Sequence, residues 1–285
     1  MDPKVVMSIA GFDPGGGAGT LCDLKTFAAL NCYGVCAITA MTIQNTYEIR
    51  NILPYSGNQV CAQIDCLLSD FQISAFKTGM MATEDIISRV ADLLASLNPI
   101  NLVVDPVLVS SSGVELFAND AVDRYKTKLF PIATLITPNI FEAQLLSGIE
   151  VTSQKSLEHC AISLHELGPK LVLIKGGHFP DISLKIADFS DHETAATDLI
   201  YDGSNFTYLN STYIDTINTH GTGCTLSSAI CCHISQGNSV AESIAKAKNY
   251  VYESISSARN WSLGKGHGPL NHFWFNPQRD DKSNS

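Results

Sequence analysis

The stretch from residue 5 to residue 30 sets the pattern of the chain: VVMSIA at 5–10, glycine-rich GFDPGGGAG at 11–19, and TLCDLKTFAAL at 20–30. The first run is short, apolar and bounded by glycine, which predicts a buried strand. Leu24 and Phe27 belong to a set of apolar residues with helical spacing, so the last run predicts a helix against a sheet. Strand, tight loop and helix in this order form the unit of a parallel sheet covered by helices.

The same alternation continues for most of the chain. We expect strands at 33–43, 49–53, 73–78, 102–105, 133–137 and 171–174. We expect helices at 60–68, 84–97, 140–146, 157–167 and 240–258, and one that begins at Thr225. Segments between 184 and 208 alternate in polarity and contain Asp202-Gly203, which predicts short antiparallel strands. The pattern therefore predicts an α/β fold with a largely parallel sheet and helices on both faces.

Length and composition indicate one globular domain. The 285 residues exceed the usual range of about 100–200 per domain, but α/β folds of this size often share a single core. Hydrophobic residues make up 45% and charged residues 16%, and no shift in composition marks a linker. We predict a single domain over 1–279 and a polar tail over 280–285.

Charge and cysteine usage limit the class of protein. A net charge of −10 disfavours binding to nucleic acid or to anionic membranes. No apolar stretch reaches the roughly 18 residues of a membrane span, and the start of the chain is unlike a secretion signal. Nine cysteines are scattered without a C-x-x-C pair, which favours reduced thiols over disulfides or zinc. We expect a cytoplasmic protein.

The loop Asn218-Thr219-His220-Gly221-Thr222-Gly223-Cys224 carries the strongest functional signal. Its two glycines allow a tight turn, and the apolar run after it predicts a buried helix, so free N–H groups should converge before Cys224. Such a helix start favours phosphate, and its field lowers a cysteine pKa from about 8.5, which would make Cys224 a proton acceptor. A plain glycine turn before a core helix accounts for this one motif equally well.

Polar residues also stand where predicted strands stop. Asp105 follows one apolar strand, and Lys175-Gly176-Gly177 follows another, at the sheet edge where α/β folds bind ligands. The glycines leave the Lys175 ammonium room to meet phosphate oxygens. Asn139 and Glu142 match a capping box, which is the favoured interpretation of that pair. Lys248, on the polar face of the last long helix, is expected to be solvated.

The glycines at 15–19 fit neither a dinucleotide fingerprint nor a P-loop, which disfavours a dinucleotide oxidoreductase. They suit a close-approach loop for a small ligand, or simply a tight strand-to-helix turn. Asp23, in the helix that follows, is placed to pair with Lys25 or solvent, or to accept a hydrogen bond from a ligand hydroxyl. His178 and His220 are expected to be structural hydrogen-bonding groups, because neither has a second histidine at helical spacing.

Taken together, these motifs follow one another in a specific order. They are 10–19, 23–27, 44–46, 77–80, 104–107, 137–143, 175–178, 218–224, 266–269 and 271–273. This order resembles the hydroxymethylpyrimidine and hydroxymethylpyrimidine-phosphate kinases of thiamine biosynthesis, within the ribokinase-like superfamily. The resemblance covers about residues 4–275.

The resemblance implies a ribokinase-like three-layer α/β/α sandwich with a mostly parallel central sheet, commonly found as a homodimer. It implies ATP and Mg²⁺ as cofactors. The reaction would be phosphorylation of the hydroxyl of 4-amino-5-hydroxymethyl-2-methylpyrimidine, and then of the resulting monophosphate.

The resemblance also implies roles for particular residues. Pyrimidine-site positions are Gly11, Asp23, Gln44, Met80 and Val107. Positions for magnesium are Asp105 and Glu142, and those for the nucleotide are Asn139, Lys175, Thr222 and Lys248. The catalytic group would comprise Cys224 as the base, where much of the superfamily has an aspartate, with Lys175, Gly221 and Gly223 stabilising charge on the transferred phosphoryl.

Three sites depart from the sequence that is most common in the family: Gly15, Thr20–Cys22 and Ser110–Gly113. They bear on contacts between a lid and the substrate phosphate, and hence on the second phosphorylation. Two other functions remain open. A pyridoxal kinase would act on a similarly flat heteroaromatic hydroxymethyl compound, and a non-catalytic module would bind a thiamine precursor on a kinase-like scaffold.

Overall fold

The computed structural model describes residues 2–97, 100–108, 121–177 and 195–275. Its strands are β1 (Val5–Phe12), β2 (Tyr33–Gln44), β3 (Ile49–Pro54), β4 (Ile73–Thr78), β5 (Leu102–Val104), β6 (Leu135–Ile136), β7 (Leu171–Ile174), β8 (Ala195–Tyr201) and β9 (Phe206–Thr212). Its α-helices are α1 (Gly19–Ala29), α2 (Gly57–Leu68), α3 (Glu84–Ser96), α4 (Ala121–Arg124), α5 (Ile140–Ser147), α6 (Gln154–His165), α7 (Thr222–Ser235) and α8 (Val240–Ala258).

All nine strands form one sheet in the order β3-β2-β1-β4-β5-β6-β7-β8-β9. The pairs from β2 through β7 are parallel, and β3, β8 and β9 add antiparallel edges. The chain runs from β1 to β2 on one side and later returns to β4 on the other. The carboxyl ends of β1 and β4 therefore flank the point where strand order reverses, which is where open α/β sheets bind ligands.

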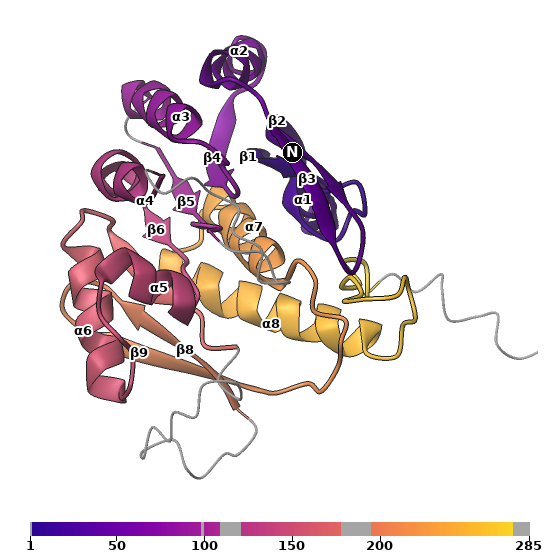
Figure 1. The fold of residues 1–285 in the computed structure, drawn as a ribbon, viewed down its shortest axis with the longest axis vertical. Helices are drawn as coiled ribbons and strands as arrows, with labels where there is room; N and C mark the ends of the chain where they lie inside the picture. Colours follow the sequence, from indigo (N-terminus) through magenta and orange to yellow (C-terminus); the bar gives the residue numbers. More distant parts are fainter. Residues whose placement is uncertain (1, 98–99, 109–120, 178–194, 276–285) are drawn as a thin grey trace, which may run out of the picture.

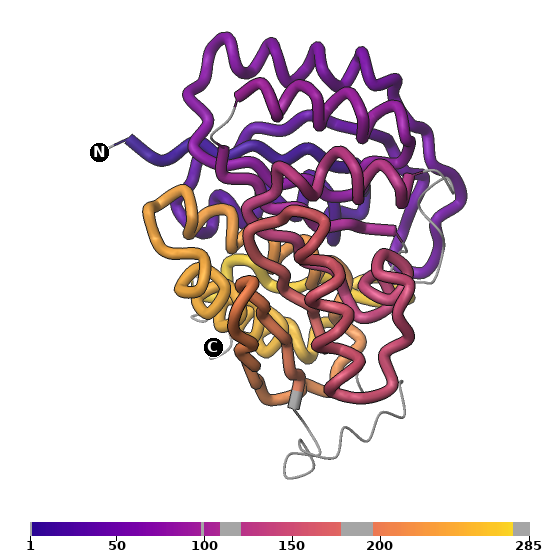
Figure 2. The backbone as a smooth tube through the Cα atoms, turned by 90° about the vertical axis from the view of Figure 1, so that its left-hand side faces the viewer, coloured from indigo at the N-terminus to yellow at the C-terminus, as the bar shows by residue number. Residues whose placement is uncertain are grey.

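Helices cover both faces of this sheet (Figure 1). One face packs against α2, α3, α5 and α6, and the other against α1, α7 and α8. Alternate strand residues supply the two cores: on β5, Val103 faces the α7 side, whereas Leu102 and Val104 face the other. Figure 2 shows that both halves of the chain form one continuous body. The predicted three-layer α/β architecture is confirmed.

Most predicted elements are present, but several bounds differ; α2 and α6, for example, each begin three residues before the predicted helix. Residues 121–132 form α4, a short π-helix (Tyr125–Leu129) and a 3-10 turn (Phe130–Ile132), which the sequence analysis did not predict. The strand expected at 133–137 is shortened to β6. Helix α7 begins three residues before Thr225, because Gly221 takes a left-handed conformation there (φ +87°).

The expected strands between 184 and 194, His178, the loop at 110–113 and the tail at 280–285 lie outside the described residues. All nine cysteines are free thiols. Among the helices that the structure describes, none combines the length and apolarity needed to cross a membrane.

We predict that Leu94→Ala destabilises the fold by about 2–5 kcal/mol, because the side chain on α3 is fully buried in the core and its loss leaves a cavity. Leu93→Ala, which truncates the half-buried neighbour, should cost clearly less. Urea unfolding of both variants measures the difference. Equal losses would contradict the orientation of α3.

Candidate functional site

The glycine-rich loop after β1 is held by one side chain, Asp13. Its Oδ1 accepts a hydrogen bond from the Gly15 N–H (2.8 Å), and its Oδ2 accepts from the N–H groups of Gly17 (3.2 Å) and Ala18 (2.9 Å). Although burial opposes ionisation, contacts with His220 and these amides lower the pKa of Asp13. The sequence analysis gave Asp13 no role, yet an aspartate followed by Pro-Gly is typical of a side chain that caps its own turn.

A second loop, before α7, meets the first at very short range. A Cβ on Gly221 would lie 1.8 Å from the Gly17 carbonyl oxygen, and no side chain caps the start of α7. His220 Nε2 lies 2.9 Å from Asp13 Oδ2, which links the two loops. The expectation that His220 is a structural hydrogen-bonding group is thus confirmed.

Lys175 and Asp105 form an ion pair at the carboxyl edge of the sheet. The distance from Lys175 Nζ to Asp105 Oδ1 is 2.7 Å. Thr137 and Ser227 also donate to this carboxylate, and Asp105 is buried. Burial opposes its charge, but Lys175 and Lys77 lower the pKa of Asp105.

Gly223 lies over the Lys175–Asp105 pair. A Cβ there would be 3.2 Å from Lys175 Nζ and 3.7 Å from Asp105 Oδ2. The start of α7, the cation and the carboxylate are therefore within one small volume. This is the combination that the sequence analysis expected at a phosphate site.

Asn139 and Glu142 form the predicted capping box at the start of α5. The Glu142 N–H donates to Asn139 Oδ1, and the Asn139 N–H donates to Glu142 Oε2, both at 2.8 Å. Burial raises the pKa of Glu142 to about 7; Asp105 adds to this effect and Lys175 opposes it. Glu142 is therefore a structural cap that also lies in the field of the Lys175–Asp105 pair.

Lys248 is not simply solvated, as the sequence analysis expected. Its Nζ lies 2.5 Å from Asp198 Oδ2 and donates to the Ala196 carbonyl (3.2 Å). The other oxygen of Asp198 accepts from the Gly176 N–H (2.8 Å). Lys248 thus fixes the backbone just after Lys175, because α8 packs beside β8 and β9.

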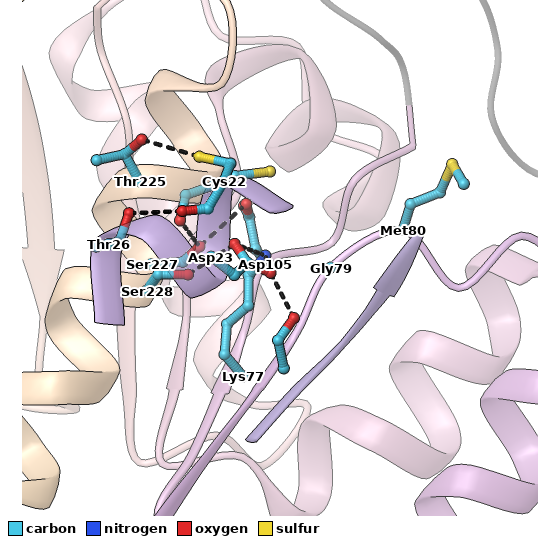
Figure 3. A network of polar contacts seen from close by, with 12 residues as sticks. Cys22, Asp23, Thr26, Lys77, Gly79, Met80, Asp105, Thr225, Ser227 and Ser228 are labelled. Atoms are coloured by element: carbon cyan, nitrogen blue, oxygen red, sulfur yellow. Dashed lines mark hydrogen bonds and ion pairs between the residues drawn. The ribbon is translucent and has the colours of Figure 1, made fainter. Parts of the chain in front are cut away.

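Asp23 lies in a buried ion pair with Lys77. Its carboxylate is fully buried and accepts from Lys77 Nζ (2.9 Å to each oxygen), Ser8 Oγ (2.5 Å) and Ser228 Oγ (2.7 Å). Lys25 instead donates to the Gly16 carbonyl. The expected pair of Asp23 with Lys25 or solvent is therefore wrong, whereas its contact with a ligand stays a prediction. Figure 3 shows Asp23 and Lys77 together in the network of polar contacts.

The expected lowering of the Cys224 pKa is also wrong for this structure. Burial raises the pKa of the thiol to about 11; Lys77 and the Gly19 N–H oppose this, and Asp23 and Asp105 add to it. The helix start alone does not outweigh burial among two carboxylates. Thr222, two residues before Cys224, donates hydrogen bonds from both its N–H and its hydroxyl to the Thr219 carbonyl.

Three of the expected pyrimidine-site residues meet in an apolar corner. Met80 and Ala40 are buried together, with Val107 packed against them. A Cβ on Gly11 would lie 2.3 Å from the Met80 Cε, so Gly11 belongs to the same corner. Gln44 stands at another edge, where its Nε2 is 3.4 Å from His220 Nε2.

The structure thus brings Lys175, Asp105, Gly221, Gly223 and Cys224 together at the mouth of α7. No group of three or more His, Cys, Asp or Glu side chains within the described ranges could hold a metal by itself. Any cation there would need further ligands from a substrate.

Comparison with known proteins gives the family. The family model described as phosphomethylpyrimidine kinase matches residues 13–271. The chain belongs to this family. It is 39% identical to the hydroxymethylpyrimidine/phosphomethylpyrimidine kinase of Haemophilus influenzae, over 95% of this chain and 97% of that protein. It is 40% identical to the thiamine biosynthesis bifunctional protein ThiED of Geobacter sulfurreducens, of which the matched region spans 52%.

Solved structures show the same fold. A pyridoxal kinase from Staphylococcus aureus in complex with AMP-PCP and pyridoxal aligns with a TM-score of 0.83 and 32% identity, over 96% of this chain and 95% of that one. A phosphomethylpyrimidine kinase from Clostridium difficile aligns with a TM-score of 0.75 and 34% identity, over 88% and 99%. The predictions of this family and of an ATP-dependent kinase in thiamine biosynthesis are confirmed.

We predict that Gly221→Ala lowers kcat/KM by at least about 10²-fold, because the backbone must shift away from Gly17 and misplace the start of α7. The matched control is Gly237→Ala at the other end of the helix. Gly237 has the same left-handed conformation but nothing within 4 Å, so its variant should lose only about 1–2 kcal/mol of stability. Equal activity in the two variants would contradict the role of this close approach.

We predict that alkylation of Cys224 by iodoacetamide accelerates by about tenfold per pH unit from pH 7 to pH 9, without a plateau. Only the thiolate reacts, and a pKa of about 11 keeps the thiol protonated throughout this range. Peptide mass spectrometry measures the rate, with exposed Cys66 as the internal reference. A plateau by pH 8 would show that the pKa is lowered after all.

Proposed function

We propose that the protein transfers the γ-phosphoryl of ATP to the hydroxyl of 4-amino-5-hydroxymethyl-2-methylpyrimidine, and then phosphorylates the monophosphate to the diphosphate. The observation that carries this proposal is the convergence of Cys224, Gly223, Lys175 and Asp105 at the start of α7. Gly19 links this point to the apolar corner, because its N–H bonds Cys224 and a Cβ on it would lie 2.2 Å from the carbonyl oxygen of Gly11, which packs on Met80. A flat ring and a transferable phosphoryl would thus meet at one point.

The apolar corner and Gln44 suit an aminopyrimidine. Gly11 carries no side chain beside the Met80 methyl group, and Met80 packs with Ala40 and Val107, so this corner offers apolar surface to a ring. A glutamine amide offers both a donor and an acceptor to the edge of the ring. Gln44 already accepts from Thr42 Oγ1 (3.1 Å), which fixes its orientation beside His220.

Phosphoryl transfer needs a proton acceptor and positive charge. As the substrate oxygen forms its bond to the γ-phosphorus and the bond to the β-phosphate oxygen breaks, the hydroxyl proton passes to Cys224 Sγ. The amides of Gly221, Gly223 and Cys224 and the Lys175 ammonium would stabilise the charge on the transferred group, whereas the Thr222 N–H is already bonded to Thr219. Cys224 must be a thiolate when it acts, so the positive groups around it matter.

The residues present fit a magnesium ion shared with nucleotide phosphates. Asp105 and Glu142 are two neighbouring carboxylates. Burial raises the pKa of Glu142, and the negative charge of Asp105 raises it further, so a cation between them would stabilise both ionised groups. Magnesium is usually held by one or two carboxylates plus phosphate oxygens and water. When bound, it would neutralise charge on the phosphates; Asp105 and Glu142 would hold it, directly or through water.

The nucleotide would lie along β7 and α8. Lys175, Asn139 and Thr222 would surround its phosphate end, and Lys248 with Asp198 orders the backbone at Gly176. Asn139 and Lys175 also pair through a backbone bridge, which aligns these two neighbouring strand ends.

We further propose a cytoplasmic homodimer. Met41 and Ile43 on β2 and Leu53 on β3 are exposed apolar residues near the edge of the sheet, and Met41 and Leu53 are direct cross-strand partners. Exposed apolar patches commonly mark protein–protein contacts, so we propose that a second copy of the chain covers this one. The nine free thiols suit a reducing compartment.

Purified protein with MgATP is expected to convert the hydroxymethylpyrimidine to its monophosphate and then to its diphosphate, as detected by mass spectrometry. Cys224→Ala should lower kcat by about 10²–10⁴-fold, the usual contribution of a general base, whereas Cys66→Ala on exposed α2 should not. No product from either pyrimidine would overturn the proposal. Undiminished turnover by Cys224→Ala would remove Cys224 from the mechanism only.

A pyridoxal kinase is the second candidate. The S. aureus pyridoxal kinase aligns with a higher TM-score (0.83) than the C. difficile phosphomethylpyrimidine kinase (0.75), which supports it. The ratio of kcat/KM for hydroxymethylpyrimidine and pyridoxal decides between them. A clear preference for pyridoxal would reverse the order of the two candidates.

A further inference from the structure

Helices α1 and α7 are joined by two successive contacts at their N-terminal ends. In the first, the Gly19 N–H of α1 bonds Cys224 of α7. One turn further along both helices, Ser228 Oγ donates to Asp23 Oδ1 (2.7 Å). Residues four apart lie on the same helix face, so the Asp23 carboxylate lies directly beneath Cys224.

Asp23 brings a fully buried lysine to this position. Lys77 reaches across from β4 and donates to both oxygens of Asp23 at 2.9 Å, and both side chains are 0% exposed. A Cβ on Gly79 would lie 2.9 Å from Lys77 Nζ, so the ammonium occupies space that a side chain at this position would need. Figure 3 shows the pair at the centre of the polar network.

A buried ion pair of this kind rarely serves stability. Desolvation of two charges roughly cancels their attraction, and apolar residues of similar size often stabilise as well or better. No step of the proposed phosphoryl transfer uses Lys77. The cost of burying the Lys77–Asp23 pair is explained if the pair acts on the neighbouring Cys224 thiol.

We infer that the buried Lys77–Asp23 pair is a positioning pair for Cys224, in which Lys77 favours the thiolate and Asp23 both anchors Lys77 and limits its effect. This inference rests on the proposed function only in taking Cys224 as the base. Lys77 would supply the positive charge that the helix start alone does not provide. Asp23 would keep the ammonium in place and protonated.

Other groups also face the thiol. The titratable and charged neighbours of Cys224 are Asp23 and Cys22 of α1, Lys77 of β4, Asp105 just after β5 and Lys175 just after β7. Lys175 and Asp105 are paired with each other, so their charges largely cancel. Cys22 contacts Thr225 and His272 and stays neutral, because burial raises its pKa. The Lys77–Asp23 pair is therefore the part of this environment that single substitutions can unbalance.

The test is the pH profile of Cys224 alkylation, measured by peptide mass spectrometry in buffer with EDTA and without nucleotide. Lys77→Met removes the positive charge and is expected to slow alkylation at pH 9 by about tenfold, one unit of pKa. Asp23→Asn removes the negative charge, keeps an acceptor for Lys77, and is expected to accelerate alkylation by about tenfold. Both variants remove the ion pair, so a purely structural role would change the two alkylation rates in the same direction.

Two further variants complete the design. Lys77→Met leaves a buried carboxylate unpaired and is the variant most at risk of not folding. If it does not fold, the double variant Asp23→Asn/Lys77→Met is compared with Asp23→Asn. The double variant should return the alkylation rate toward that of the wild type. Leu94→Ala, which destabilises without changing charge, should leave the profile unchanged. The inference would be overturned if the alkylation rate changed in the same direction in the two single variants, or if either rate changed by less than about threefold. Because alkylation needs no turnover, these outcomes are independent of whether the pyrimidine is the substrate.

Discussion

The close approach of Gly221 to Gly17 is the constraint on which the site depends. Because no Cβ fits between them, the loop after β1 and the loop before α7 are held in contact, and two helix starts face the same small volume. Asp13 stabilises one loop through three amides and reaches the other through His220. The backbone amides that would hold a phosphoryl group are thus arranged before any ligand arrives, which is the condition for electrostatic stabilisation without reorganisation.

Buried charge is arranged in two layers beneath these loops. Lys175 and Asp105 lie at the sheet edge, where Gly223 leaves room above them, and Lys77 and Asp23 lie one layer deeper, fully enclosed. Each pair also accepts hydrogen bonds from hydroxyl groups, Thr137 and Ser227 in one and Ser8 and Ser228 in the other. Since α7 supplies a serine to both, a movement of α7 would change the surroundings of both pairs together.

The sequence predicted the elements well because each has a clear period and clear ends, as at α8 and β4, whose predicted bounds match. It predicted the sheet-edge residues because a charged residue directly after a buried apolar strand must lie where that strand leaves the core. It failed where a property depends on what packs around a residue. Cys224 stands at a helix start, but its pKa follows from burial and from two carboxylates far away in sequence. Asp23 was misplaced for the same reason, although Lys77 inside an apolar strand already indicated a buried acidic partner.

The two candidate substrates differ little in what they ask of the phosphoryl-transfer half of the site. On the proposed function, Lys175, Asp105 and the start of α7 would act on the γ-phosphoryl of ATP and on a hydroxymethyl group, which both compounds carry. Discrimination would then come from the other half, where we propose that Gln44, Met80 and Val107 meet the ring. Gln44 is held by Thr42 and faces His220, so its amide has a fixed direction, and a fixed amide rejects a ring whose edge offers the wrong donor or acceptor more strongly than an apolar wall does. On this proposal, specificity would depend on the hydrogen bonds that orient one glutamine, while the chemistry would depend on the buried charges below.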